Sequence, residues 1–231
     1  MPDSPLIIAH TSDSHIGGRW HHGAELGALK SVLEAAAEAS AQVLILAGDV
    51  FDTNRVPAAI VEQAATMLDD ARVQSVVLPG NHDPATPDAV YRLQALADVP
   101  NVSVIGIDVP DTVQFPALDL ELWGIAHLDY HDMAPLAQPK PRAAKWHIAI
   151  AHGHWVRGPY DEHRSWLIHD HEITATAADY VALGHWDVPQ PAGDGTVPAY
   201  YSGSPDIAKS INIVTFGPDG VDVRRHPLRL E

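Results

Sequence analysis

Five clusters of Asp, Asn and His side chains each follow a short apolar segment of the chain. Imidazole, carboxylate and amide groups are ligands for divalent cations, and the chain has no cysteine that would offer a thiolate instead. The residue types therefore indicate a metal centre built from nitrogen and oxygen ligands. The clusters are Asp13-Ser14-His15, Gly48-Asp49-Val50-Phe51-Asp52, Gly80-Asn81-His82-Asp83, His152-Gly153-His154 and Gly184-His185-Trp186-Asp187.

The position of these clusters predicts that they converge. Strands of an open α/β sheet place their ligands at the carboxyl edge, so side chains that follow several strands meet there. Two cations held close together repel each other, and a carboxylate shared between them offsets that repulsion. We expect Asp49 to be this bridge. Glycines before Asp49, Asn81 and His185 indicate sharp turns that expose the next side chain.

Each cluster taken alone has a purely structural explanation. A single His in a chain with 15 of them is more often a surface or hydrogen-bonded residue than a ligand. Asp13 and Asp49 are also suited to helix N-caps, and Asn81 to Asp83 before Pro84 suits an ordinary turn. These explanations do not account for five such clusters in succession, each directly after an apolar strand. The metal centre is therefore the favoured interpretation.

The spacing of apolar residues predicts the elements that position these groups. Helical spacing occurs at 24–40 and 57–71, between strands at 6–10, 43–47 and 75–79. The second half is rich in strands, so we expect an α/β fold: a four-layer α/β/β/α sandwich of two packed mixed β-sheets flanked by helices, as a single domain over 1–231. The later strands are predicted at 102–105, 118–125, 146–151, 180–183, 199–202, 211–216 and 221–226.

The charge of the chain bears on its substrate. Fourteen Lys and Arg against 30 Asp and Glu give a formal charge of −16, which opposes tight binding to long nucleic acid. Bound cations reverse the local field that a phosphate meets, so a polynucleotide substrate stays open. The N-terminus has no signal-peptide pattern and the apolar runs are short, from which we expect a cytoplasmic protein without a membrane span.

The ordered motifs resemble those of the calcineurin-like metallophosphoesterases: DxH, GDxxD, GNH(D), a strand-ending His and GHxH. The resemblance spans the whole chain and implies the metallophosphoesterase fold. Within the family, the segments 48–55, 180–185 and 201–205 look most like the SbcD-type DNA repair exonucleases. The resemblance implies a phosphodiesterase or nuclease.

The resemblance also implies roles for particular residues. Asp49 would contact both cations, and His82 would stand beside the scissile phosphate and assist the leaving oxygen as a catalytic acid. The cofactors would be two divalent ions, with Mn²⁺ favoured and Mg²⁺, Fe or Zn²⁺ as alternatives. The first ion would be held by Asp13, His15, Asp49 and the last residue of GHxH, and the second by Asp49, Asn81, His152 and His185.

One position departs from the family pattern, and at another the pattern fits either of two histidines. Asp187 stands where GHxH ends in His; as a carboxylate ligand it would make the site harder and favour manganese or magnesium over zinc. If Asp187 points elsewhere, the first ion is weakly held. His152 directly follows an apolar strand and is the preferred ligand over His154, which we expect near the substrate. Arg19 and Arg55 are candidates for substrate binding, with solvated surface positions as the equal alternative.

Three functions remain in competition at this point. The first is a two-metal phosphoester hydrolase that acts as a phosphodiesterase or nuclease on DNA. The second is a small-molecule phosphoesterase, such as a cyclic nucleotide phosphodiesterase, which the acidity favours. The third is a noncatalytic binding module, which only Asp187 supports. SbcD-type nucleases carry an accessory domain and work with an ATPase; for this chain we expect neither a separate capping domain nor a segment for an ATPase partner.

Overall fold

Two six-stranded sheets form the centre of the computed structural model, which describes residues 5–18 and 24–230. In the first sheet β1 to β4 run parallel, and β13 joins β1 in the antiparallel direction and continues into a hairpin with β14. The order in the first sheet is β14 (Gly220–Pro227), β13 (Ser210–Gly217), β1 (Leu6–Thr11), β2 (Val43–Ala47), β3 (Gln74–Leu78) and β4 (Val102–Val104).

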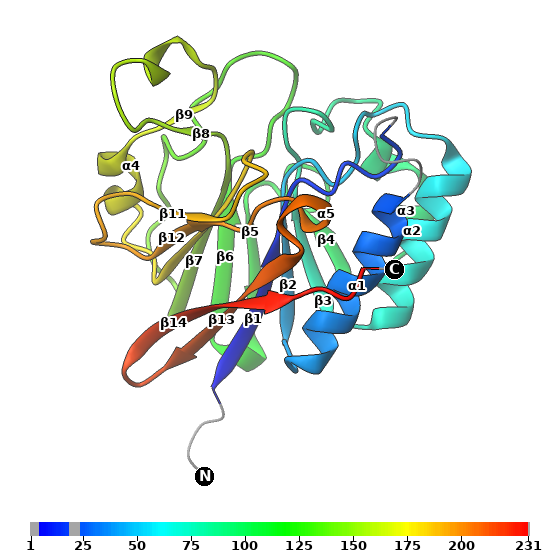
Figure 1. Ribbon diagram of the computed structural model, residues 1–231, viewed down its shortest axis with the longest axis horizontal. Helices are drawn as coiled ribbons and strands as arrows, with labels where there is room; N and C mark the ends of the chain where they lie inside the picture. The colour runs from blue at the N-terminus through cyan, green and yellow to red at the C-terminus, as the bar shows by residue number, and fades with distance from the viewer. Residues whose placement is uncertain (1–4, 19–23, 231) are drawn as a thin grey trace.

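The second sheet is also mixed. Its four inner strands are parallel, and both edge strands are antiparallel to their neighbours. A separate two-stranded pair, β8 (His154–Trp155) with β9 (Leu167–Ile168), lies above this sheet (Figure 1). The order in the second sheet is β11 (Gln190–Ala192), β12 (Ala199–Tyr201), β10 (Tyr180–Gly184), β7 (Trp146–His152), β6 (Leu120–Gly124) and β5 (Thr112–Phe115).

The alternation of side chains along the strands assigns each residue to a layer. On β2, Ile45 faces the core between the two sheets, whereas Leu44 and Leu46 face the helices. On β10, Ala182 faces the same central core, whereas Leu183 faces the outer side of the second sheet. Both central strands are buried on both faces, which explains why their sequences are continuous apolar runs.

Helices cover the first sheet more fully than the second. Figure 1 shows α1 (Ala24–Glu38) and α2 (Ala58–Ala71) on the outer side of the first sheet, with α3 (Gln94–Ala97) beside them. The second sheet is covered by α4 (Asp170–Ala175) and by loops, and α5 (Pro205–Ala208) packs near α1. The predicted four-layer α/β fold is confirmed, with a thin fourth layer. In the described ranges, no helix combines the length and the apolar character that crossing a membrane requires.

The predicted strands and long helices are found within a few residues of their expected ends. The helix predicted at 57–71 begins at Ala58, because Pro57 is its N-cap with an extended ψ of 135°. Short elements were not predicted, among them β5, β8, β9, β11 and α4. Of the short strands, only β4 and β12 were predicted; the others contain too few alternations of apolar and polar residues for a clear signal.

Candidate metal centre

The ends of β1, β2, β3, β7 and β10 bring most of the predicted ligands into one cluster around the buried Asp13, Asp49 and His152. Two groups of ligand atoms within 4.8 Å of one another occur among the described residues: His15, Asp49 and His82 form one, and Asp13, Asp49 and His152 form the other. Asp49 belongs to both groups. Asp49, the carboxylate that we expect to bridge two cations, is thus the residue that the two groups share.

Asn81 connects His152 with His185, the remaining histidine among the predicted ligands. Its Oδ1 lies 3.1 Å from His152 Nε2 and 3.1 Å from His185 Nδ1, and His152 Nε2 lies 3.2 Å from Asp49 Oδ2. Neighbouring ligands on a divalent cation, with bonds of about 2.0–2.2 Å, lie about 3.0–3.4 Å apart. The pairs Asp49–His152, His152–Asn81 and Asn81–His185 are thus spaced as neighbouring ligands of an ion would be.

Backbone contacts fix the other members of the cluster. Both carboxylate oxygens of Asp13 accept a hydrogen bond from His185 N, at 3.0 and 3.1 Å. Asp49 Oδ1 accepts from His82 N at 2.9 Å. His15 Nδ1 lies 3.4 Å from Asp52 Oδ1 and has no hydrogen-bond partner among the described residues, and the His15 and His82 rings meet edge to face with centroids 4.8 Å apart.

Burial and neighbouring charges shift the pKa values of the acidic and imidazole side chains in this cluster. Burial alone would raise the pKa of Asp49, but the adjacent His152 outweighs it and holds that pKa well below its usual range. Burial alone would lower the pKa of His152, but Asp49 and Asp13 raise it to about 10. Burial raises the pKa of Asp13 and lowers that of His185 to about 3. Two buried carboxylates thus share one imidazolium, a deficit of positive charge that divalent cations would offset.

Four members of the cluster have left-handed backbone conformations. The φ angles are 54° at Asp13, 44° at His15, 51° at Asp49 and 106° at His185. Such conformations cost about 1–3 kcal/mol each in non-glycine residues and are enriched at functional sites. Hydrogen bonds between the turns, from Asp13 N to Gly48 O and from His15 N to Asp49 O, both at 3.0 Å, stabilise them.

The glycines that precede the ligands serve close packing as well as turning. Gly48 has a φ of 89°, and a Cβ there would lie 2.0 Å from His152 Nδ1. A Cβ on Gly80 would lie 2.2 Å from Asp49 Oδ1, and one on Gly184 would lie 1.8 Å from Ala47 O. The sequence expectation of sharp turns applies to Gly48, whereas Gly80 and Gly184 are needed because other chain segments approach them.

This packing gives a prediction for the Gly184→Ala protein. The added methyl group meets a backbone carbonyl in the core, so we expect a loss of about 1–3 kcal/mol in the free energy of unfolding, measured by chemical denaturation. Gly27→Ala is the matched control, because nothing lies within 4 Å of its Cβ position in α1 and alanine favours helix. A Gly184→Ala protein as stable as the Gly27→Ala protein would contradict the close packing.

The structure separates the two candidate histidines that follow the apolar segment of β7. His152 Nδ1 bonds to Ala47 O at 2.9 Å, which leaves Nε2 facing Asp49 and Asn81. His154 has both ring nitrogens engaged away from the cluster: Nδ1 accepts from Trp186 Nε1 at 3.2 Å, and Nε2 lies 3.4 Å from Asp161 Oδ1.

Two other predicted residues, Asp187 and Arg55, are not part of the cluster in the ranges that the structure describes. Asp187 is exposed in the loop after β10 and belongs to neither group of ligand atoms. Arg55 is exposed after β2, and its guanidinium makes no contact with the cluster in the part of the chain that the structure describes. Arg19 lies outside the described residues.

Two residues that support the cluster were given no role from the sequence: Asp83, which was quoted only as part of a motif, and His127, which was not singled out. Asp83 accepts hydrogen bonds from Phe51 N at 2.9 Å and Gly80 N at 2.8 Å, and its pKa is raised to about 6 by burial and by Asp49. His127 is buried, and its Nε2 bonds to His152 O at 2.9 Å. His127 follows the apolar strand β6 closely, so its position at a strand end was the available signal.

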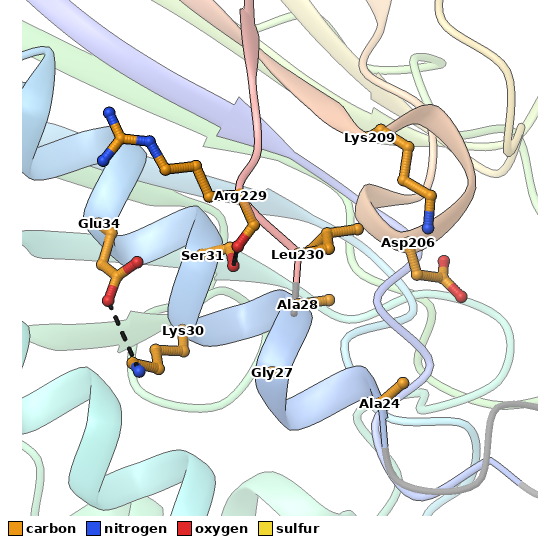
Figure 2. A pocket seen from close by; sticks show the side chains of 10 residues that line it. All are labelled: Ala24, Gly27, Ala28, Lys30, Ser31, Glu34, Asp206, Lys209, Arg229 and Leu230. Carbon is orange, nitrogen blue, oxygen red and sulfur yellow. Dashed lines mark hydrogen bonds and ion pairs between the residues drawn. The ribbon is translucent and has the colours of Figure 1, made fainter.

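A groove of about 360 Å³ lies away from this cluster. Figure 2 shows it between α1, α5 and the C-terminal segment, with the Lys30–Glu34 ion pair on one side and Lys209 on the other. No predicted site residue within the described ranges lines it. The cluster, and not this groove, is therefore the candidate site.

Two packed mixed sheets with Asp, Asn and His gathered at their strand ends define a metallophosphoesterase, an enzyme that hydrolyses phosphate esters. The chain belongs to the calcineurin-like phosphoesterase family, whose sequence pattern matches residues 6–189. This match includes all the residues of the cluster.

Relatives of known name agree with this family. The chain is 26% identical over 265 residues to the SbcD component of the nuclease SbcCD of Bacillus subtilis, and 29% identical over 242 residues to the DNA double-strand break repair protein Mre11 of Haloferax volcanii. The matches cover 92% and 96% of this chain but 67% and 52% of those proteins.

Solved structures share the fold at lower identity. Protein TT1561 of Thermus thermophilus has a TM-score of 0.64 at 12% identity, over 96% of this chain and 99% of that one. A structure described as a novel archaeal phosphodiesterase has a TM-score of 0.53 at 15% identity, over 96% of this chain and all of that one. At such identities the likeness concerns the fold alone.

Proposed function

We propose that this protein is a two-metal phosphodiesterase of nuclease type, with DNA strands or nucleotides as substrates. The observation that carries this proposal is the position of Asp49, whose carboxylate belongs to both groups of candidate ligands. Two divalent cations bound there would supply an activated water and stabilise the charge of the phosphoryl oxygens. The similarity to the SbcD component of SbcCD and to Mre11 supports a nucleic acid substrate and a role in DNA repair.

We assign Asp49, Asn81, His152 and His185 to the second ion because their ligand atoms are already adjacent. We assign Asp13, His15 and Asp49 to the first ion, with Asp187 as a further ligand once its carboxylate turns inward. A donor set of oxygens and imidazoles without thiolate favours Mn²⁺ or Mg²⁺. Because both sheets contribute ligands, residues 1–231 would act as one catalytic domain.

The chain's own residues would orient the substrate and move a proton. The bond from His152 Nδ1 to Ala47 O holds that ring with Nε2 toward the cluster, as metal-binding histidines are commonly held. The His82 side chain is 46% exposed and so accessible to substrate, and its Nδ1 lies 3.1 Å from Asp52 O. His82 would donate a proton to the leaving oxygen.

The charge of the chain supports a second candidate, a phosphoesterase for small molecules. A formal charge of −16 repels a long polyanion more strongly than a mononucleotide. Rates on single-stranded oligonucleotides, a 3′,5′-cyclic nucleotide and p-nitrophenyl phosphate, each measured with Mn²⁺, Mg²⁺ and Zn²⁺, test both candidates. We expect phosphodiesters to be cleaved at least about tenfold faster than the monoester; cleavage of the monoester alone would contradict the proposal.

Metal binding should release a proton. In the metal-free protein the pKa of His152 is raised to about 10, so at pH 8 its ring is protonated and must lose a proton before Nε2 can bind a cation. We expect release of about one proton from this residue, and an apparent metal affinity that rises with pH below about 10. Calorimetric titration with Mn²⁺ in two buffers of different ionisation enthalpy measures the number; equal heats in both buffers would contradict the assignment.

A further inference from the structure

Three side chains beside the metal centre form a stack that the proposed chemistry does not use. The Arg157 guanidinium lies over the Trp186 ring, 4.5 Å from its centroid. Trp186 stacks on Tyr201 with centroids 5.0 Å apart and planes 16° apart. Tyr201 is buried, Trp186 is half-buried and Arg157 is exposed. The stack therefore leads from the core to the surface, with the guanidinium at its outer end.

Hydrogen bonds hold both rings of the stack in place. The Tyr201 hydroxyl donates to Gly153 O at 2.7 Å and accepts from Trp155 N at 2.9 Å. Trp186 Nε1 donates to His154 Nδ1 at 3.2 Å. A platform fixed in this way loses little conformational entropy when a ligand binds to it.

The stack adjoins the cluster, because Trp186 directly follows His185 in the chain. The His154 ring is close to both, with its centroid 5.1 Å from that of Trp186 and 6.1 Å from that of His185. A phosphoryl group held at the cluster would therefore have its attached groups within reach of the stack.

The guanidinium itself is free to bind a ligand. In the described ranges, Arg157 donates no side-chain hydrogen bond and forms no ion pair, although Asp161 is close enough to interact with its charge. Tyr160, in the same loop as Arg157, is 92% exposed, and Val188, two residues after Trp186, is 61% exposed. An exposed aromatic ring and an exposed apolar side chain near the stack would contact a flat ligand with an apolar face.

We propose that Arg157, supported by Trp186, is a subsite that stacks a nucleobase of the substrate next to the phosphoester at the metal centre. The proposal rests on the proposed function and narrows its substrate class to nucleotidyl esters. Nucleobases stack on aromatic side chains and on Arg guanidinium planes, and each stacked base contributes about tenfold or more to affinity.

Equilibrium binding tests this subsite without requiring turnover. Calorimetry with Mg²⁺ present compares adenosine 5′-monophosphate with ribose 5-phosphate, which lacks the base. We expect the nucleotide to bind about tenfold more tightly or better, and the ratio to fall to about one in the Arg157→Ala protein. Arg157→Lys keeps the charge without the plane and should also lose most of the preference. Arg164→Ala, an exposed arginine of the same loop, is the matched control and should keep it.

Two results would overturn the subsite: equal binding of the two ligands by the unaltered protein, or full preference in the Arg157→Lys protein, which would mean that charge alone suffices. Hydrolysis of methyl p-nitrophenyl phosphate, a diester without a base, separates this failure from failure of the proposed function. Hydrolysis of this diester without a base preference in binding would support the proposed function and contradict the subsite. A base preference that depends on Arg157, without hydrolysis of any diester, would support the subsite and contradict the proposed function.

Discussion

The Asp49→Asn protein is expected to lose at least one metal ion and about 1,000-fold or more in kcat/KM for a phosphodiester. The substituted amide has the same shape but no charge, so it cannot offset the repulsion between two cations. It also removes the partner of the buried His152, whose Nε2 lies 3.2 Å from the carboxylate. Metal content by inductively coupled plasma mass spectrometry and rates at saturating Mn²⁺ measure the two effects.

Asp222→Asn is the matched control for this substitution. Asp222 is an exposed carboxylate on β14, paired with Arg224 and remote from the strand ends that carry the cluster. We expect its metal content and rate to equal those of the unaltered protein. An Asp49→Asn protein that is folded, holds two ions and keeps its rate would remove Asp49 from the centre of the site.

The His82→Ala protein is expected to keep its metal and lose rate. A positioned proton donor typically contributes about 10²–10⁴-fold, and this loss should appear with a nucleoside leaving group. With p-nitrophenolate, which leaves without a proton, we expect a loss of about tenfold or less. His131→Ala, an exposed histidine in another loop, is the control and should change neither rate.

The metal content of the His82→Ala protein decides whether His82 is a proton donor or a metal ligand. A ring nitrogen of His82 lies within 4.8 Å of ligand atoms of His15 and Asp49, so His82 could itself bind a cation. If it does, the His82→Ala protein will lose an ion, and its rates with the nucleoside and with the p-nitrophenolate leaving group will fall by the same factor. That outcome would assign His82 to the metal and leave the proton transfer to another group.

The long helices and strands could be predicted because the apolar residues that each of them buries recur at a recognisable spacing. The strand at Val43–Ala47 was predicted with its correct ends, since five consecutive apolar residues are bounded by polar ones. The helix predicted at 24–40 ends two residues earlier in the structure, at Glu38. In contrast, β8 and β9 have two residues each and form only because the loops that carry them meet. Contacts between loops have no signature in local sequence.

The site was predictable where glycine and a ligand follow a strand together. Asp49, Asn81 and His185 were identified in this way, Asp13 by its place after the first strand, and the structure brings all four together. Sequence position favours His152 over His154, but it does not reveal the contacts that separate them, with Ala47 O and Trp186 Nε1, which come from other segments of the chain.

The ligand role of Asp187 stays a prediction. Its place in the motif suggests that role, and the structure has the residue exposed in the loop after β10. The backbone there is held by a hydrogen bond from Ser204 N to Asp187 O at 3.1 Å, a contact that the motif does not reveal.

Anomalous diffraction from crystals grown with Mn²⁺ would examine the metal centre most directly. We expect two manganese peaks on either side of the Asp49 carboxylate, with Asn81, His152 and His185 around one of them. Strong peaks elsewhere in the molecule, or none at this cluster at saturating Mn²⁺, would contradict the two-metal centre and the phosphodiesterase chemistry built on it.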